Sequence, residues 1–266
     1  MSESILAHNV SAGKRWGTAA EGYEAFSEHF ADAIAHCVEG AAVGRGDRVL
    51  DIATGTGWAA RLLASSGAKV VGIDFGEDLI LAARRLARKA GVDIDFQVGD
   101  AEALVFGDAA FDVVVSSFGV IFAGDHQRAA GEIKRVCRPG GRLAMTAWTA
   151  DGVIARYGRE VHSRYSPTPP VPMTRWGDPA YAQSLLGDAF DLRVESAATI
   201  LRAPSGEAVW DLWRRSSGPT MAILAQASPE QQRAFQADFI SFHEQYRGAS
   251  GIEMPREYHL YTGTRR

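Results

Sequence analysis

The sequence lacks the features that mark secreted, membrane-embedded and nucleic-acid-binding proteins. It has only two cysteines, Cys37 and Cys137, in no metal-ligand or redox spacing, so we expect free, buried thiols in a reducing compartment. No apolar run approaches the about 18 residues of a membrane span, and residues 1–15 lack the apolar stretch of a signal peptide. The net charge of −4 predicts no basic face for nucleic acid. These absences predict a cytoplasmic protein that neither enters a membrane nor binds nucleic acid.

What the sequence does contain is a regular alternation of strand and helix patterns between residues 47 and 150. The predicted strands are 48–53, 69–74, 94–98, 111–117 and 142–148, and the predicted helices are 58–66, 77–90 and 126–137. The runs AKVVGID and FDVVVSS are apolar throughout, which is typical of strands buried on both faces. After the turn RPGG at 138–141, two later strand patterns follow at 190–201 and 257–265. We therefore predict an α/β fold with a Rossmann-like, seven-stranded, mostly parallel sheet, helices on both faces, and an antiparallel last strand.

The segments on either side of this core are predicted to be mainly helical. Apolar residues from Trp16 to Ile34 recur every three or four positions, which predicts one helix over residues 15–40. A proline-rich stretch at 166–180 predicts an irregular insert. Further helices are expected at 178–187, 205–215 and 229–246. We expect a single domain with an N-terminal helical cover (1–43), a core (44–150) and a C-terminal part with a helical insert (151–266).

A glycine-rich loop follows the first predicted strand. The run from Gly55 to Ala60 matches the pattern GxGxx(G/A), in which glycines allow a ligand to approach the backbone at a helix N-terminus. A dinucleotide enzyme would use this loop for a pyrophosphate. An S-adenosylmethionine enzyme would use it for the amino-acid part of its cofactor. The loop alone therefore leaves both alternatives open.

Aspartates lie at the ends of three successive predicted strands, and two of them, Asp51 and Asp100, favour the second alternative. Asp51 lies four residues before Gly55, where a dinucleotide fold normally has an apolar residue. A carboxylate there suits a cationic ligand, because an unpaired buried charge is costly. Asp74 ends the second strand and suits the ribose hydroxyls of either cofactor. Asp100 follows the third strand and could accept from an adenine amine, while the backbone of Ala101 donates to a ring nitrogen.

The ordered segments VLDIATGTG, VVGIDF, VGDAEAL, FDVVVSSFGVIFAGD and EIKRVCRPGGRLAMTAW resemble class I S-adenosylmethionine-dependent methyltransferases. The resemblance is closest to the small-molecule group that includes the ubiquinone/menaquinone-biosynthesis C-methyltransferases, and it covers residues 47–150. It implies in-line methyl transfer from S-adenosylmethionine, with S-adenosylhomocysteine as the product. It implies cofactor contacts at Trp16, Tyr23, Asp51, Ala53, Gly55, Thr56, Gly57, Asp74, Phe75, Asp100, Ala101, Glu102, Ser116 and Ser117. Among these, Phe75 corresponds to the residue that packs on adenine, and helix packing is the alternative role for Trp16 and Tyr23.

The acceptor is expected beyond the fourth strand. The loop SSFG lacks the (N/D)PP(Y/F) segment of adenine-N6 and glutamine methyltransferases. It also lacks the nucleophilic cysteine of cytosine-C5 methyltransferases. No cluster of carboxylates predicts the metal site of a metal-dependent catechol methyltransferase. A small organic acceptor remains. Phe118-Gly119 is followed by Val120-Ile121 instead of the Arg-Asn pair of the quinone enzymes, which argues against a quinone ring. The predicted pocket residues are Phe118, Phe122, Trp148 and Trp176.

The sequence identifies no catalytic base with certainty. His126 is the best-placed candidate, with a surface histidine at a helix N-terminus as the alternative, and His162, His243 and Tyr165 are weaker candidates. An NAD(P)-dependent oxidoreductase and a non-catalytic S-adenosylmethionine-binding regulator are the rival functions. The sequence leaves open which acceptor atom is methylated and whether the chain forms a homodimer.

Overall fold

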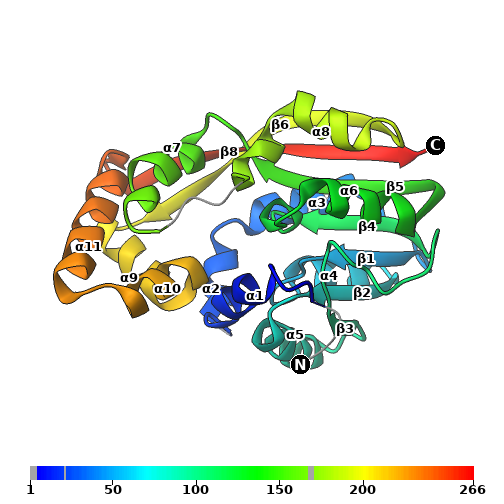
Figure 1. Cartoon of the computed structure of the whole chain (residues 1–266), viewed down its shortest axis with the longest axis horizontal. Helices are drawn as coiled ribbons and strands as arrows, with labels where there is room; N and C mark the ends of the chain where they lie inside the picture. Colours follow the sequence, from blue (N-terminus) through cyan, green and yellow to red (C-terminus); the bar gives the residue numbers. More distant parts are fainter. Residues whose placement is uncertain (1–4, 21, 167–170) are drawn as a thin grey trace.

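A mixed eight-stranded sheet organises the chain, and the structure, a computed structural model, describes residues 5–20, 22–166 and 171–266 (Figure 1). The strand order is β3-β2-β1-β4-β5-β8-β6, with β7 paired to β8. The strands are β1 (Arg48–Ile52), β2 (Lys69–Asp74), β3 (Asp95–Val98), β4 (Phe111–Ser117), β5 (Cys137–Trp148), β6 (Phe190–Ala203), β7 (Arg247–Gly248) and β8 (Gly251–Arg265). Strands β1 to β5 are parallel, and β8 runs antiparallel between β5 and β6. The predicted Rossmann-like sheet with a reversed last strand is confirmed.

Helices cover both faces of the sheet because its central strands are apolar on both sides. Val49 and Val113 join one buried cluster, and their neighbours Leu50 and Val114 join another. The core helices are α3 (Ala31–Gly40), α4 (Trp58–Ser65), α5 (Glu77–Ala90), α6 (His126–Val136) and α8 (Pro179–Leu186). The first three pack together on one face, and α6 and α8 lie on the other. Both cysteines are free and buried, as expected.

The predicted turn at residues 138–141 is part of β5. The pairing with β4 jumps from Phe111↔Cys137 to Val113↔Arg142, so the RPGG residues bulge out of the ladder. Gly140 has a φ of +71°, which a glycine adopts without strain.

The prediction of one helix over residues 15–40 is wrong. The structure has three helices there: α1 (Val10–Gly17), α2 (Gly22–Glu28) and α3. Ala20 has a φ of +42° between the first two, and Phe30 leaves the helical region before the third. The breaks have a packing reason, because α1 packs against α5, α2 packs against a C-terminal helix, and α3 packs on the sheet. A continuous helix could not reach all three surfaces.

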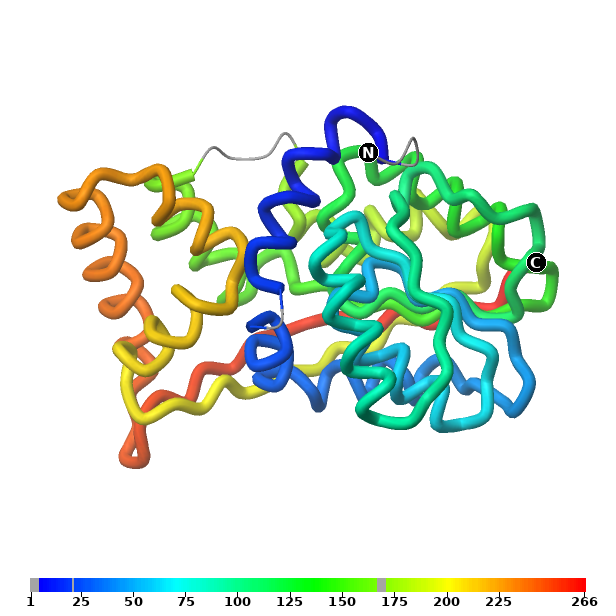
Figure 2. Tube along the Cα trace, turned by 90° about the horizontal axis from the view of Figure 1, so that it is seen from below, coloured from blue at the N-terminus to red at the C-terminus, as the bar shows by residue number. Residues whose placement is uncertain are grey.

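The C-terminal half adds a helical layer that we call the cap. The cap consists of α7 (Val153–Glu160), α9 (Gly206–Ser216), α10 (Gly218–Gln226) and α11 (Pro229–Glu244). Strands β6 and β8 pair from Phe190↔Arg265 to Ala203↔Ile252, whereas β5 pairs with β8 only as far as Trp148↔Tyr258. The antiparallel β6–β8 pair therefore projects beyond the core, and the chain between the two strands forms most of the cap. Figure 2 shows the cap helices along this projection, with α1 and α2 between the cap and the core.

Short 3-10 helices complete the chain: η1 (Val120–Phe122), η2 (His162–Arg164) and η3 (Met173–Gly177). The predicted irregular insert at 166–180 thus contains η3 and the start of α8, while residues 167–170 of it lie outside the described residues. The sequence patterns did not predict α7 or α10. In the described ranges, no helix has the length and apolar character to cross a membrane.

Candidate active site

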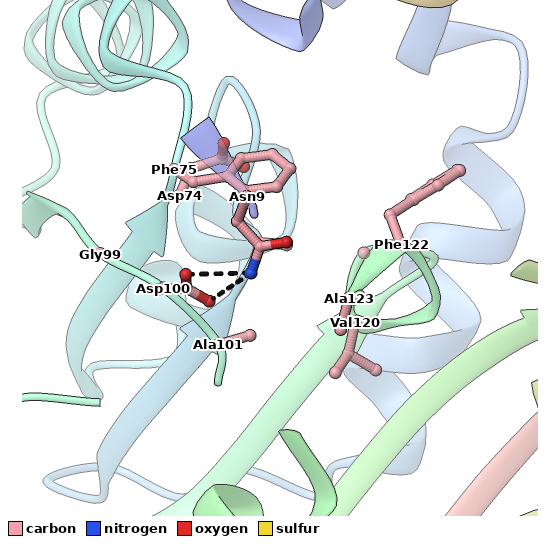
Figure 3. A pocket seen from close by; sticks show the side chains of 11 residues that line it. Asn9, Asp74, Phe75, Gly99, Asp100, Ala101, Val120, Phe122 and Ala123 are labelled. Atoms are coloured by element: carbon pink, nitrogen blue, oxygen red, sulfur yellow. Dashed lines mark hydrogen bonds between the residues drawn. The ribbon is translucent and has the colours of Figure 1, made fainter. Parts of the chain in front are cut away.

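A cavity lies at the carboxyl ends of β1, β2, β3 and β4, where an open parallel sheet normally binds its ligand (Figure 3). Its lining comes from segments far apart in the sequence: Asn9, Ala53, Asp74, Phe75, Gly99, Asp100, Ala101, Gly119, Val120, Phe122 and Ala123. The structure thereby brings together six of the predicted site residues: Ala53, Asp74, Phe75, Asp100, Ala101 and Phe122.

The loop between β1 and α4 takes conformations that favour glycine. Ala53, Gly55 and Gly57 have φ angles of +56°, +57° and +81°. A Cβ at Gly57 would lie 2.6 Å from Cζ of Phe96, a fully buried ring on β3. A Cβ at Gly55 would lie 3.0 Å from the ring of Tyr23. The loop is therefore enclosed between β3 and α2.

Helix α2 also fastens this loop through a residue that the sequence patterns did not reveal. Glu24 accepts from the hydroxyl of Thr56 at 2.6 Å and forms an ion pair with Arg61. Arg61 in turn donates to the carbonyl of Thr56 at 2.7 Å. Tyr23 precedes Glu24, and burial together with the charge of Asp74 raises the pKa of its hydroxyl. The N-terminal helices thus form the outer wall of the site.

Two buried carboxylates face this loop, and no cationic side chain of the described residues pairs with either. Asp51 is 1% exposed and accepts from the hydroxyl of Thr54 at 2.6 Å. Asp74 is 5% exposed and accepts from the N–H groups of Gly55 at 3.0 Å and Gly76 at 2.8 Å. Burial raises the pKa of Asp51 to about 7 and that of Asp74 to about 6. Such groups suit a cationic or hydroxyl-bearing ligand, which would offset the cost of their burial.

The N-terminal segment bonds to Asp100. One carboxylate oxygen accepts from Asn9 at 3.2 Å and from the N–H of Glu102 at 2.9 Å. The other accepts from Asn9 at 3.0 Å (Figure 3). It also accepts from the N–H of Leu6 at 3.0 Å. Glu102 also accepts from Asn9 at 2.9 Å and bonds to His8 at 2.7 Å. Four donor contacts therefore surround the Asp100 carboxylate.

The last two residues of β4, Ser116 and Ser117, bond to neighbouring segments of the core. Ser116 is fully buried, and its hydroxyl donates to the carbonyl of Ile52 and accepts from the N–H of Val120, both at 2.9 Å. Ser117 lies 3.4 Å from the Thr146 hydroxyl on β5. The geometry thus gives Ser116 a structural task at this edge of the sheet.

Two of the predicted pocket aromatics stack on each other at the ends of β4 and β5. The rings of Phe118 and Trp148 lie 3.9 Å apart and nearly parallel. Phe30 contacts both edge-on, at 5.8 and 6.2 Å. Phe122 instead contacts Trp16 at 4.8 Å, beside the cavity. Tyr23 and Phe26 connect Trp16 to Phe30 through further ring contacts, and Phe26 also contacts Trp213 in the cap.

Two other predictions need correction. His126 is 2% exposed, so the alternative of a surface histidine is wrong. Its ring nitrogens face the carbonyl of Ile121 and the hydroxyl of Tyr181, each at 3.3 Å, and burial lowers its pKa. Trp176 is completely buried, and its ring contacts those of His126 and Tyr181 instead of the Phe118–Trp148 stack. The reason is that its 3-10 helix packs on η1 and β5. Trp176 is therefore a core residue.

The three weaker base candidates lie in or beside the cap. Tyr165 donates to Asp238 at 2.8 Å. His243 is 1% exposed and stacks on Phe239, and His162 lies 6.4 Å from Tyr157 between ring centres.

Comparisons with known proteins agree with this geometry. The family model described as "Methyltransferase domain" matches residues 50–145. The uncharacterized protein Rv1405c of Mycobacterium tuberculosis is 34% identical over 237 residues, covering 86% of this chain and 85% of that protein. The demethylmenaquinone methyltransferase of Thermus thermophilus is 46% identical over 100 residues, covering 37% of this chain and 46% of that enzyme. The YcgJ protein of Bacillus subtilis has the same fold, with a TM-score of 0.61, 19% identity, and coverage of 88% and 98%.

Fold, site and relatives define a methyltransferase of the Rossmann-like class. The chain belongs to the class I S-adenosylmethionine-dependent methyltransferases, near the quinone-methyltransferase group. It is an enzyme that transfers a methyl group from S-adenosylmethionine, its cofactor. The residues of the site fit this cofactor, because the two buried carboxylates, Asp51 and Asp74, lack a cation among the described residues and the glycine loop turns toward them.

The close approach of Gly57 to Phe96 leads to a stability prediction. Gly57→Ala should lower the free energy of unfolding by about 2–4 kcal/mol, because a left-handed alanine is strained and its Cβ meets a rigid buried ring. Gly91→Ala is the matched control: its φ is +69°, but its Cβ would meet nothing within 4 Å. Urea denaturation of both variants separates backbone strain from the clash. Equal losses of unfolding free energy in the two variants would show that the Phe96 ring moves aside without destabilising the protein.

Proposed function

We propose that this methyltransferase acts on a small organic acceptor bound at the Phe118–Trp148 stack, between the core and the cap. The observation that carries the proposal is the enclosure of this stack: Phe118 is 6% and Trp148 is 7% exposed, at the carboxyl ends of β4 and β5. A macromolecular acceptor needs an open face, whereas a buried aromatic site suits a small molecule. The predicted division into an N-terminal cover (1–43), a cofactor-binding core (44–150) and a substrate-side part (151–266) belongs to this proposal.

The cofactor contacts follow from the chemistry of the residues around the cavity. Asp51 and the loop at Gly55 would hold the methionyl part, and Asp74 would accept from the ribose hydroxyls. Phe75 and Val120 line the cavity together with Asp100 and would contact the adenine ring. Tyr23 and Trp16 would cover the cofactor from α2 and α1.

The protein's own task in this reaction is alignment. S-adenosylmethionine supplies an electrophilic methyl group when bound, so the protein need only orient the acceptor and exclude water. The aromatic residues Phe30, Phe118 and Trp148 perform both tasks at the proposed acceptor site. His126 is a weak candidate for the base, because the cavity lining does not include it and its ring nitrogens face Ile121 and Tyr181.

The two free cysteines support a cytoplasmic location. Cys37 is fully buried and Cys137 is 2% exposed, and neither is paired in a disulfide. Cysteines kept as thiols are usual in a reducing compartment.

Cofactor binding should release a proton near pH 6. Burial raises the pKa of Asp51 to about 7, and an ammonium group beside it would favour the ionised form. Affinity for S-adenosylhomocysteine should therefore fall as the pH drops from about 7.5 to about 5.5. Without ligand, the folded protein holds a proton that the unfolded chain releases near 3.8, so this group's contribution to stability declines as the pH rises from about 4 to about 7. Calorimetric titration at pH 6 in two buffers of different ionisation enthalpy measures the released proton.

The control for this measurement is Asp51→Asn, which cannot release a proton from this position. Its titrations should show less proton release than the wild type. Proton uptake on binding, or the same release from the variant, would contradict the assignment of Asp51 to the cationic end of the cofactor.

Asn9 should compete with the cofactor for Asp100. Its amide makes two of the four donor contacts to that carboxylate, so an adenine amine can bind there only by displacing it. Asn9→Ala should therefore raise the affinity for S-adenosylhomocysteine severalfold, measured by calorimetry. His8→Ala is the control, because His8 bonds to Glu102 and not to Asp100. Weaker binding by Asn9→Ala would show that Asn9 contacts the cofactor instead.

A homocysteine-release screen tests the proposed acceptor. We expect turnover with at least one small compound among carboxylic acids, phenols, amines and quinones. Asp74→Ala should abolish it by weakening cofactor binding. Turnover with purified RNA or protein, and with none of the small compounds, would contradict the proposal. Tight S-adenosylmethionine binding without any turnover would instead favour the non-catalytic alternative.

A further inference from the structure

A buried arginine without a carboxylate partner lies between the core and the cap. Arg256 on β8 is 2% exposed, and its guanidinium carbon lies 5.9 Å from the ring centres of both Phe30 and Trp148. One terminal nitrogen donates to the carbonyl of His29, but Nε has no partner in the described part of the chain. None of the ion pairs among the described residues includes it.

Asp32 is the acid whose charge acts on Arg256, but the two form no ion pair in the described part of the chain. Asp32 accepts from the hydroxyl of Thr199 at 2.6 Å and from the N–H of Ala33 at 2.8 Å. Burial lowers the pKa of Arg256 to about 10, which leaves its guanidinium charged at neutral pH. Buried charges in proteins are normally paired, since an uncompensated one destabilises the fold. Arg256 therefore has the surroundings expected of a residue whose partner is a ligand.

The cap contributes a second buried donor to the region between the core and the cap. The hydroxyl of Tyr157 on α7 is buried and has no partner among the described residues. Its ring lies 6.0 Å from that of His243, whose pKa is lowered to about 4 by burial, with a contribution from the charge of Arg256. His243 thus stays neutral at pH 7 and adds no positive charge. Helix α7 packs on β8 next to Arg256, and the N–H of Val153 donates to the carboxylate of Glu257 at 3.1 Å.

We propose that Arg256 and Tyr157 bind the carboxylate of a small acidic acceptor, whose apolar body packs on Phe30 and Trp148. This inference rests on the proposed small-molecule acceptor and names its chemical class. A planar guanidinium with a free Nε matches the geometry of a carboxylate, and a tyrosine hydroxyl can donate to it as well. The stack of Phe118 on Trp148 connects this position to the end of β4, beside the cavity.

Binding of matched acids and amides tests the proposal. The probes are benzoate and 3-phenylpropionate against benzamide and 3-phenylpropionamide, titrated into the full chain saturated with S-adenosylhomocysteine. The wild type should bind the acids about tenfold or more tightly than the amides, because hydrogen bonds to charged groups are the strong ones. Arg256→Met should remove this preference, and Arg256→Lys should restore part of it. Arg202→Met is the matched control, since Arg202 lies on β6, the strand paired with β8, and its side chain is 68% exposed.

Tyr157→Phe keeps the test decisive if Arg256→Met does not fold. This change removes only an unpaired hydroxyl, so the protein should remain stable while acid affinity falls severalfold. Equal binding of acid and amide by the wild type, binding of neither, or an unchanged preference in Tyr157→Phe overturns the inference. Turnover of neutral small compounds alone would overturn it and leave the proposed function intact. Turnover of no small compound, in a protein that still binds S-adenosylhomocysteine, would be a failure of the proposed function itself.

Discussion

Burial of two carboxylates at the end of a parallel sheet is the constraint on which the cofactor site depends. Asp51 and Asp74 lie on the neighbouring strands β1 and β2, removed from water and without a cation among the described residues. Their negative charge is tolerated only if nearby donors point at it. The loop after β1 therefore takes left-handed conformations that direct the N–H of Gly55 at Asp74. Phe96 packs against this loop on one side and α2 on the other, so only residues without a side chain fit at Gly55 and Gly57.

The same principle explains the course of the N-terminal segment. Asp100 and Glu102 are each 2% exposed, and they would be costly without donors. Residues before α1 supply several of these donors, from the backbone of Leu6 and the amide of Asn9. The N–H groups of Gly124 and Asp125 complete the set around Glu102. The segment is thus held by acids that lie beside the cavity, which couples its position to whatever binds there.

Much of the core could be predicted from the sequence because its signals are local. Apolar runs, the glycine loop and the strand-end aspartates place β1 to β4 and α4 to α6 within about one residue of their observed bounds. The N-terminal helix was predicted wrongly because its apolar spacing continues through breaks that tertiary packing imposes. Trp176 and His126 were assigned to the site on residue type and chain position. The burial of Trp176, and of His126 beside it, depends on the position of η3, a short helix that no clear sequence pattern predicts.

The proposed acceptor site was hard to predict for a different reason: its residues converge only in the folded chain. Phe30 precedes α3, Trp148 ends β5, Tyr157 lies on α7, and Arg256 lies on β8. The one sequence signal is the alternation in β8, where Arg256 occupies an inward position between Met254 and Tyr258. That alternation starts before residue 257, where the strand was predicted to begin, so the arginine was left outside it. An arginine at an inward position of a strand cannot be there for apolar packing alone, because its charge must be compensated. Its guanidinium lies 5.9 Å from the Trp148 ring of the Phe118–Trp148 stack, so in the proposed site the β6–β8 strand pair and the cap would take part in selecting the acceptor.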